Sequence, residues 1–227
     1  FCSRRAFCFC LLLFIGIIYV FILKSLARIQ QNVRYFKENT NMFIAVKGSN
    51  KNNRLYLAKE TWLGTFRPED TVVIVERIES QVKLQRLQSL IGPQLHVSSC
   101  GGSHNLWDLR CKTFTALRLF LLQQEHLWLC YVDDDMYLNY HKLVEVLNSY
   151  IDEKGKAVVI GDLCTRNWGQ IVWNNTILHT CGAMCATRKA INSLRPYIDS
   201  LETFHNSCGD LPDDICIPRL LYKQHIV

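Results

Sequence analysis

The sequence predicts an α/β domain built on a mostly parallel central sheet. Short apolar runs of strand length alternate along the chain with longer segments in which apolar residues recur at helical spacing, and this alternation is typical of βαβ units. Apolar residues make up 49% of the chain, so a packed core is expected rather than long disorder. The 227 residues suffice for one such domain beyond residue 40.

The first half of the domain contains two predicted strands and two predicted helices. Met42–Val46 and Thr71–Val75 are compact apolar runs, which are typical of strands. Between them, residues 54–63 have the apolar spacing of a helix. Residues 81–91 are also predicted to be helical, and the Gly-Pro pair that follows them ends that helix.

The second half begins with the longest predicted helix, residues 107–124, whose apolar side chains are spaced for one face. The apolar run Leu127–Val132 follows and is expected to be a buried strand. We then expect a helix over residues 141–150, a strand at Ala157–Ile160 and a final helix over residues 215–223.

Three consecutive carboxylates, Asp133, Asp134 and Asp135, directly follow the strand Leu127–Val132. In an α/β sheet, ligands bind at the carboxyl ends of the strands. Two unit charges about 4 Å apart repel by roughly 4 kcal/mol at an intermediate dielectric, so such crowding needs water or a cation. In an extended strand end, Asp133 and Asp135 point to one side and Asp134 to the other. The triplet therefore predicts either a site for Mg²⁺ or Mn²⁺ that also binds a substrate phosphate, or a solvated acidic loop.

A second acidic site, Asp213-Asp214, stands at the start of the predicted helix 215–223. Carboxylates at this position are favoured by the helix dipole, so a simple capping role is one interpretation. Together with the triplet, a second interpretation is an inverting transferase. In that case an ion neutralises the departing diphosphate, and a separate carboxylate takes the proton of the attacking hydroxyl.

The uncharged apolar stretch 6–23 is predicted to cross a membrane, since a bilayer span needs roughly 17–25 such residues. We expect a retained signal anchor, with residues 1–5 as a cytoplasmic tail and residues 24–40 as a stem. Cleavage near Ser25-Leu26-Ala27 is the alternative. More Lys and Arg residues follow the stretch than precede it, which taken alone opposes this orientation. The chain starts without Met and stops directly after a predicted helix, so we expect a piece of a longer protein.

The cysteines favour an oxidising compartment. An even number of them follows the stem, which is compatible with a disulfide framework; these are Cys100, Cys111, Cys130, Cys164, Cys181, Cys185, Cys208 and Cys216. No Cys-x-x-Cys pair occurs, so a zinc site is disfavoured. Asn174-Asn175-Thr176 is a glycosylation sequon, predicting modification of Asn174. The net charge of +6 is carried by dispersed basic residues, and we expect no nucleic-acid partner.

The sequence Val132-Asp133-Asp134-Asp135-Met136-Tyr137 resembles the Val-Asp-Asp-Asp-Asn-Tyr segment of the Fringe glycosyltransferases. Four other matches occur in the family's order. They are Phe43-Ile44-Ala45-Val46-Lys47 with Arg54 and Glu60-Thr61-Trp62, Ser103-His104 ahead of Cys111-Lys112, Cys130 before the triplet, and Leu211-Pro212-Asp213-Asp214. The matches extend over residues 42–222, so the resemblance is specific although diverged.

The resemblance implies a GT-A-type fold for residues 41–227, placed in the Golgi lumen behind a single-pass type II anchor. It implies β1,3-linked transfer of GlcNAc from UDP-GlcNAc to O-linked fucose on EGF-like repeats of Notch-type receptors, with Mn²⁺ as cofactor. A β1,3-galactosyl- or glucosyltransferase of the same superfamily is an alternative. A non-catalytic luminal protein that binds glycans with the same fold is another.

Roles for individual residues also follow from the resemblance. Asp135 is implied as the metal ligand and Asp214 as the catalytic base, with Asp213 as its nearest rival. The implied substrate-binding residues are Lys47 and Arg54, which would reach the uridine or diphosphate, together with Asp133, Asp134 and Asp213. The implied disulfides are Cys100–Cys111 and Cys130–Cys185.

Two departures from the family pattern concern the site. The family's glycine-rich stretch is here Cys181-Gly182-Ala183-Met184, where Met184 is expected to alter the acceptor pocket. The family's metal-binding histidine would lie past Val227, because His225 is too close to Asp214 to match it.

Overall fold

The computed structural model describes residues 18–19, 22–25, 41–51, 53–150, 155–161, 172–173, 176–177 and 182–224. The chain divides into two units between Thr40 and Asn41. In the first unit the described residues are helical and exposed, and most of the predicted anchor and stem lies outside the description. Among the residues described, no helix has both the length and the apolar character that a bilayer span requires.

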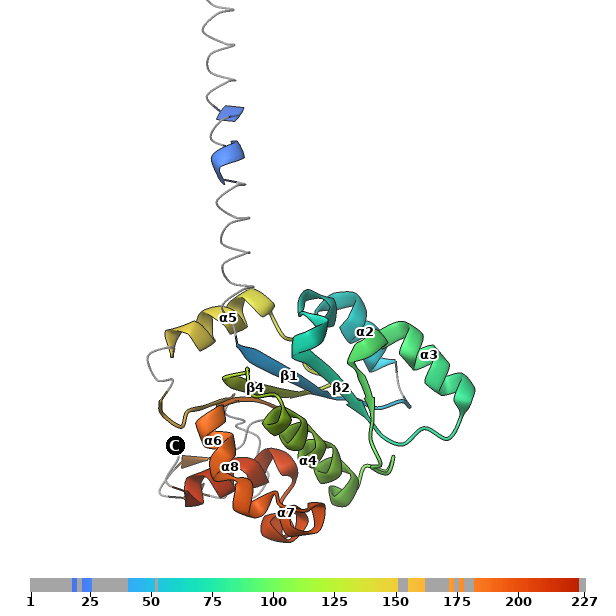
Figure 1. Cartoon of the computed structure of the whole chain (residues 1–227), viewed down its shortest axis with the longest axis vertical. Helices are drawn as coiled ribbons and strands as arrows, with labels where there is room; N and C mark the ends of the chain where they lie inside the picture. The colour runs from blue at the N-terminus through green and yellow to red at the C-terminus, as the bar shows by residue number, and fades with distance from the viewer. Residues whose placement is uncertain are drawn as a thin grey trace, which may run out of the picture. The chain divides into compact units, whose positions relative to one another are not determined.

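The second unit is built on a six-stranded mixed sheet in the order β3-β2-β1-β4-β8-β5 (Figure 1). Strands β3, β2, β1 and β4 are parallel, whereas β8 is antiparallel to both β4 and β5. The bounds are β1 Met42–Lys47, β2 Thr71–Val75, β3 Leu95–Val97, β4 Trp128–Asp133, β5 Val159–Gly161 and β8 Ala183–Thr187. The α/β class is therefore confirmed, and the sheet is mixed because of β8.

Helices lie on both sides of this sheet, as Figure 1 shows. One side carries α2 (Arg54–Thr61), α3 (Gln81–Ile91) and α5 (Tyr140–Ser149), and the other carries α4 (Leu106–Leu122), α6 (Arg188–Ser193), α7 (Leu201–Cys208) and α8 (Asp213–Lys223). Short 3₁₀ turns occupy Leu63–Thr65, Pro68–Asp70, Gly92–Gln94 and Arg195–Tyr197, and a separate hairpin pairs β6 (Val172–Trp173) with β7 (Thr176–Ile177).

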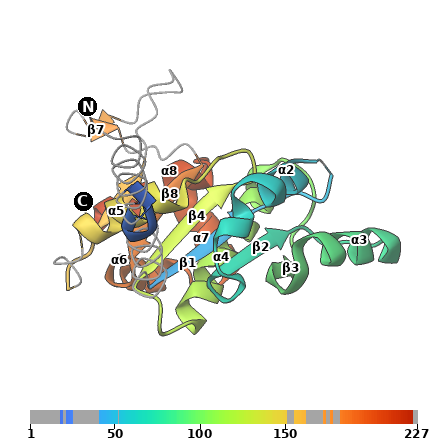
Figure 2. The same ribbon diagram turned by 90° about the horizontal axis from the view of Figure 1, so that it is seen from above.

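Burial on both faces explains why the central strands are continuous apolar runs. β1 is buried along its whole length and β4 up to its last residue, as expected for parallel strands covered by helices on both sides. They lie next to each other in the sheet (Figure 2). Side chains of α4, α6, α7 and α8 complete the main core against β1, β4 and β8.

Polar caps fix where several helices begin. The side chains of Ser80, Asn105, Asn139 and Ser200 each accept the backbone N–H three residues on, which satisfies a donor that the first turn leaves open. Helix α8 begins differently, because its N-cap is Pro212, which has no polar side chain.

The predicted strand Thr71–Val75 and the predicted helix 81–91 have the observed bounds of β2 and α3, and the other predicted elements exist with shifted ends, including β5 and α8. Among the strands and α-helices described in this unit, β3, β6, β7, β8, α6 and α7 were not predicted. All six are short, from two to eight residues, and the hydrophobic pattern of such short segments does not identify them.

Three disulfides join described elements. Cys100–Cys111 connects the loop after β3 to α4, Cys130–Cys185 connects β4 to β8, and Cys208–Cys216 connects α7 to α8. The first two are the pairs that the family resemblance implies. Cys164 and Cys181 lie outside the described residues, as does the sequon residue Asn174.

Candidate active site

The chemistry-bearing residues collect at the carboxyl ends of the parallel strands. Lys47 ends β1, Glu76 follows β2, and the acidic triplet ends and follows β4. The parallel register places Lys47 directly opposite Asp133 on the neighbouring strand. This edge of the sheet is where ligands bind in α/β folds, and the structure brings the predicted residues together there.

Lys47 lies between two carboxylates. Its Nζ is 2.9 Å from Oδ1 of Asp133 and 2.5 Å from Oδ2 of Asp213, the first residue of α8. Burial opposes the charge, but the nearby carboxylates outweigh it and hold the pKa of Lys47 well above its ordinary value. In this structure the ammonium of Lys47 is buried and paired within the protein, and its contact with the uridine or diphosphate stays a prediction.

Asp213 is the most enclosed carboxylate of the site, at 3% exposed. Its Oδ2 also accepts hydrogen bonds from the hydroxyls of Thr113 at 2.5 Å and Tyr131 at 2.8 Å. Burial alone would raise the pKa of Asp213, but the charge of Lys47 and these hydrogen bonds lower it to about 2. Asp213 is thus a fixed buried anion in this structure, and its substrate contact and its role as the rival base stay predictions.

The other triplet carboxylates differ in openness. Oδ2 of Asp134 accepts the backbone N–H of Ser49 at 3.0 Å, and burial raises the pKa of this mostly enclosed acid. Asp135 is half exposed, and its Oδ2 lies 3.0 Å from Nη1 of Arg54. Arg54 also approaches Asp134, at 3.5 Å. The arginine predicted to bind substrate therefore neutralises the triplet from its solvent side.

A divalent ion needs several oxygen ligands that converge on one point. Oxygen ligands suit Mn²⁺, and Asp135 offers a carboxylate that is open to solvent. In the part of the chain that the structure describes, however, no three His, Cys, Asp or Glu side chains converge closely enough to hold a metal. The described residues alone do not fit a complete Mn²⁺ site.

Asp214 follows Asp213 in the first turn of α8 and is only partly buried. Both carboxylates lie within that turn rather than at the cap position, which Pro212 occupies. Acidic side chains are common in this first turn, next to the positive end of the helix dipole. Because Asp213 is fixed by Lys47, the position of α8's first turn, and with it Asp214, is tied to the end of β1.

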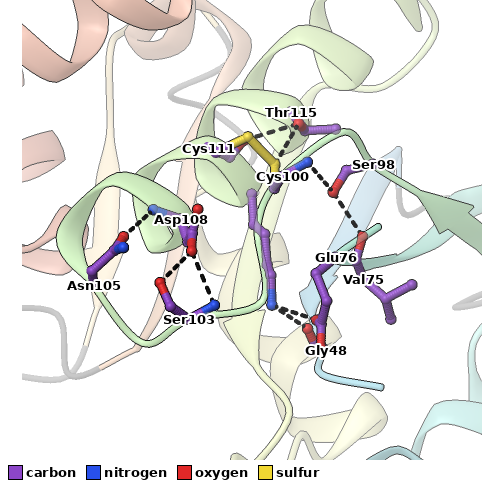
Figure 3. Close-up of a disulfide and its surroundings, with 11 residues drawn as sticks. Gly48, Val75, Glu76, Ser98, Cys100, Ser103, Asn105, Asp108, Cys111 and Thr115 are labelled. Carbon is purple, nitrogen blue, oxygen red and sulfur yellow. Dashed lines mark hydrogen bonds and ion pairs between the residues drawn. A yellow bond between two sulfur atoms is a disulfide. The ribbon is translucent and has the colours of Figure 1, made fainter. Parts of the chain in front are cut away.

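A second buried ion pair supports the loop after β1 (Figure 3). Nζ of Lys112 on α4 donates to Oε2 of Glu76 at 2.9 Å and to the carbonyl of Gly48 at 2.8 Å. Oε1 of Glu76 accepts from the Ser49 hydroxyl and the Asn50 N–H. Sequence reasoning missed Glu76, although its place directly after an apolar strand was the same signal that identified the triplet.

Gly182 allows β8 to pass close to the triplet. Its φ is +78°, and a Cβ built there would lie 2.5 Å from Oδ2 of Asp133, while its carbonyl accepts the Asp133 N–H at 2.8 Å. Met184, two residues on, is buried in the main core. That Met184 alters the acceptor pocket stays a prediction, and Gly182 is the position in this stretch where an added side chain would meet the triplet.

Two open cavities adjoin this edge. One of about 490 Å³ is lined by residues that follow β1, β2 and β3, including Asn50, Glu76 and Gly101. The wall at Gly101 to Ser103 is fixed by Asp108 of α4, which accepts the Ser103 N–H at 2.9 Å and its hydroxyl (Figure 3). A second, of about 770 Å³, lies along α2 and α3.

The chain matches the sequence model of the Fringe-like family over residues 37–225. It is 32% identical over 111 residues to the radical fringe β-1,3-N-acetylglucosaminyltransferase of Xenopus laevis, covering 48% of this chain and 31% of that protein. Identity to manic fringe of Homo sapiens, also named a β-1,3-N-acetylglucosaminyltransferase, is 32% over 111 residues, covering 48% and 32%. The chain thus matches less than a third of the length of these relatives. A crystal structure of S. aureus TarS 1–349 in complex with UDP-GlcNAc is similar with a TM-score of 0.36 and 19% identity, covering 68% of this chain and 46% of that one.

Proposed function

The chain belongs to the Fringe-like family, and from this membership we propose that it is an inverting glycosyltransferase of GT-A type. The donor is UDP-GlcNAc, and the product carries GlcNAc in β1,3 linkage. The relatives named as β-1,3-N-acetylglucosaminyltransferases support this choice of donor sugar. The acceptor we propose is O-linked fucose on EGF-like repeats of Notch-type receptors.

One observation in the structure carries the proposal. The acidic triplet at the end of β4 and the first turn of α8 are joined through a single buried lysine, Lys47. A diphosphate-facing acidic cluster and a separate carboxylate are the two parts that an inverting transferase requires. The cavity beside Glu76 and Asn50 lies at the same strand ends and has room for the nucleoside.

The proposed reaction uses Asp214 as general base. The acceptor hydroxyl gives its proton to Asp214 as its oxygen attacks the anomeric carbon of GlcNAc, and the bond from that carbon to the diphosphate breaks with UDP as leaving group. Direct attack inverts the anomeric configuration. Asp214 is favoured over Asp213 because Asp213 is buried and its pKa of about 2 makes it a poor proton acceptor.

Mn²⁺ is the proposed ion, with Asp135 as one ligand because it is the most exposed carboxylate of the triplet. When bound, the ion would supply positive charge against the diphosphate. Asp133 and Asp134 would hold this edge of the sheet in place. Asp133 does so through its ion pair with Lys47, and Asp134 through the hydrogen bond that it accepts from the Ser49 N–H.

We further propose a Golgi membrane protein of type II. Residues 1–5 would be cytoplasmic, 6–23 the signal anchor, 24–40 the stem and 41–227 the luminal catalytic domain. The three disulfides of the described domain support an oxidising compartment.

In the test, the full chain is incubated with Mn²⁺, an O-fucosylated EGF-like peptide and one of three donors, UDP-GlcNAc, UDP-galactose or UDP-glucose. Transfer of sugar to the peptide is measured by mass spectrometry. We expect GlcNAc addition, and a loss of about 10²- to 10⁴-fold in Asp214→Asn. Asp199→Asn, an exposed aspartate ahead of α7, is the matched control and should keep activity. Equal transfer by the Asp214 variant would refute the base, and a different preferred sugar would correct the donor.

A non-catalytic glycan-binding protein is the second candidate. It is favoured by the incomplete metal site among the described residues. Absence of turnover with every donor, together with binding of the fucosylated peptide, would decide for it.

A further inference from the structure

Four consecutive side chains of α4 each contact a different segment around the site. Arg110 reaches the loop before α8, Cys111 is bonded to Cys100, Lys112 pairs with Glu76, and Thr113 bonds to Asp213. All four are buried. Successive helical residues point about 100° apart, so one turn of α4 can reach four directions.

Arg110 makes the densest set of these contacts and is 0% exposed. Its guanidinium donates to the carbonyl of Gly209 at 2.7 Å and to the carbonyl of Leu211. It also donates to the carbonyl of His205 at 3.3 Å and to Nδ1 of that ring at 3.0 Å. The ring must accept, so it is neutral, and burial together with the Arg110 charge lowers the pKa of His205.

The segment that Arg110 holds is also tied by backbone hydrogen bonds, from the Leu211 N–H to the Cys208 carbonyl and from the Cys216 N–H to the Pro212 carbonyl. Gly209 has a φ of +60° and ends α7, whose last carbonyls have no partners within the helix. Pro212 cannot donate a backbone hydrogen bond and offers no side-chain cap to α8. The planar fork of an arginine presents five donors in fixed directions, whereas the donors of a lysine ammonium share one nitrogen. Arg110 therefore adds contacts from α4 to loop 209–212, which backbone hydrogen bonds and the Cys208–Cys216 disulfide also hold.

Arg110 and Thr113 act on the two sides of the same junction. They are three residues apart on α4 and so lie on neighbouring positions of one face. Arg110 holds the loop that enters α8, and Thr113 holds the carboxylate of Asp213 that begins it. We propose that Arg110 is a positioning residue that sets the first turn of α8, and through it the carboxylate of Asp214. The kinetic part of this inference rests on the proposed function.

The test compares Arg110→Lys and Arg110→Gln with Arg188→Lys in the full chain. Arg188 is the matched control, because its guanidinium also donates to three backbone carbonyls, those of Phe120, Gln123 and His126, at the opposite end of β4. For the Arg110 variants we expect kcat to fall about 10- to 100-fold, with the KM for UDP-GlcNAc within twofold. Arg188→Lys should keep kcat per folded molecule. A wild-type kcat in folded Arg110→Lys would overturn the inference.

Amide hydrogen exchange gives a readout that does not depend on activity. The N–H groups of Leu211 and Cys216 donate to Cys208 and Pro212 within the junction, and we expect their exchange to speed up at least tenfold in Arg110→Lys but not in Arg188→Lys. If the wild type proves inactive, the proposed function fails while this comparison still decides the role of Arg110. Unchanged exchange in Arg110→Lys would refute positioning, and Arg110→Lys is the variant to rely on if Arg110→Gln does not fold.

Discussion

Lys47 and Asp213 are 166 residues apart in the sequence, and Nζ of the lysine lies 2.5 Å from Oδ2 of the aspartate. Both side chains are almost fully buried. The pair joins the end of β1 to the start of α8, and together with the hydrogen bonds from Thr113 and Tyr131 to Asp213 it fixes the two halves of the proposed active site to each other.

Breaking this pair should strongly destabilise the domain. Lys47→Met leaves Asp213 as a buried charge without its cation, which costs about 3–5 kcal/mol, measurable by urea unfolding. The exposed pair Lys142–Glu145 is the control, and Lys142→Ala should cost less than about 1 kcal/mol. Equal losses in the two variants would contradict the central role of Lys47.

The depressed pKa of Asp213 predicts a loss of stability in acid. A carboxylate whose pKa is about 2 in the folded state and about 4 unfolded stabilises the fold above the unfolded value. This contribution, about 2 kcal/mol, is lost as pH falls from about 4 towards 2. Urea unfolding at pH 5 and pH 2.5 should show it, and Asp213→Asn should lack that part of the pH dependence. A parallel pH slope in this variant would rule Asp213 out as its source.

Gly182→Ala should disturb the triplet directly. A methyl group there would meet the Asp133 carboxylate on a backbone with positive φ, and we expect a loss of more than about 1 kcal/mol. Gly155→Ala is the control, because Gly155 has ordinary φ and no atom within 4 Å of an added Cβ. Thermal unfolding of both variants tests the difference, and equal melting temperatures would show that β8 can move away.

Arg54→Ala should test the binding of UDP-GlcNAc with little effect on the stability of the fold. Arg54 and Asp135 are both half exposed, so their contact contributes less than about 1 kcal/mol to folding. If Arg54 also faces the diphosphate, the KM for UDP-GlcNAc should rise about tenfold or more. Lys59→Ala, at a partly exposed position in the last turn of the same helix, should change neither quantity. An unchanged KM in Arg54→Ala would show that this arginine acts on the triplet and not on the donor.

The sequence located one half of the site well. The triplet was predictable because an apolar strand of ordinary length precedes it, and the carboxyl end of a strand is where ligands gather. Asp213-Asp214 was predictable only as a pair of acids at a helix start. That Asp213 is structural while Asp214 is more open depends on Lys47, Thr113 and Tyr131, which are distant in the sequence and leave no local pattern.

The missed parts of the fold have a similar explanation. Strand β8 is five residues long and contains two alanines, and nothing in its composition reveals that it runs antiparallel to β4. The hydrogen bonds from Arg110 to loop 209–212 were not predicted either. An arginine within an apolar helix is ordinarily read as a surface residue, and only the packing of α7 and α8 on α4 shows that this one is enclosed.

The turn of α4 from Arg110 to Thr113 makes the chain unequally tolerant of length changes. Residues added between Val97 and Leu106 would enlarge a loop, which costs little in closure entropy. One residue added among Arg110 to Thr113 would rotate everything after it by about 100°. Three interactions could not then all form together, namely the Cys100–Cys111 disulfide, the Lys112–Glu76 ion pair and the Thr113–Asp213 hydrogen bond. Insertions in this family should therefore accumulate ahead of α4 and be absent from that turn.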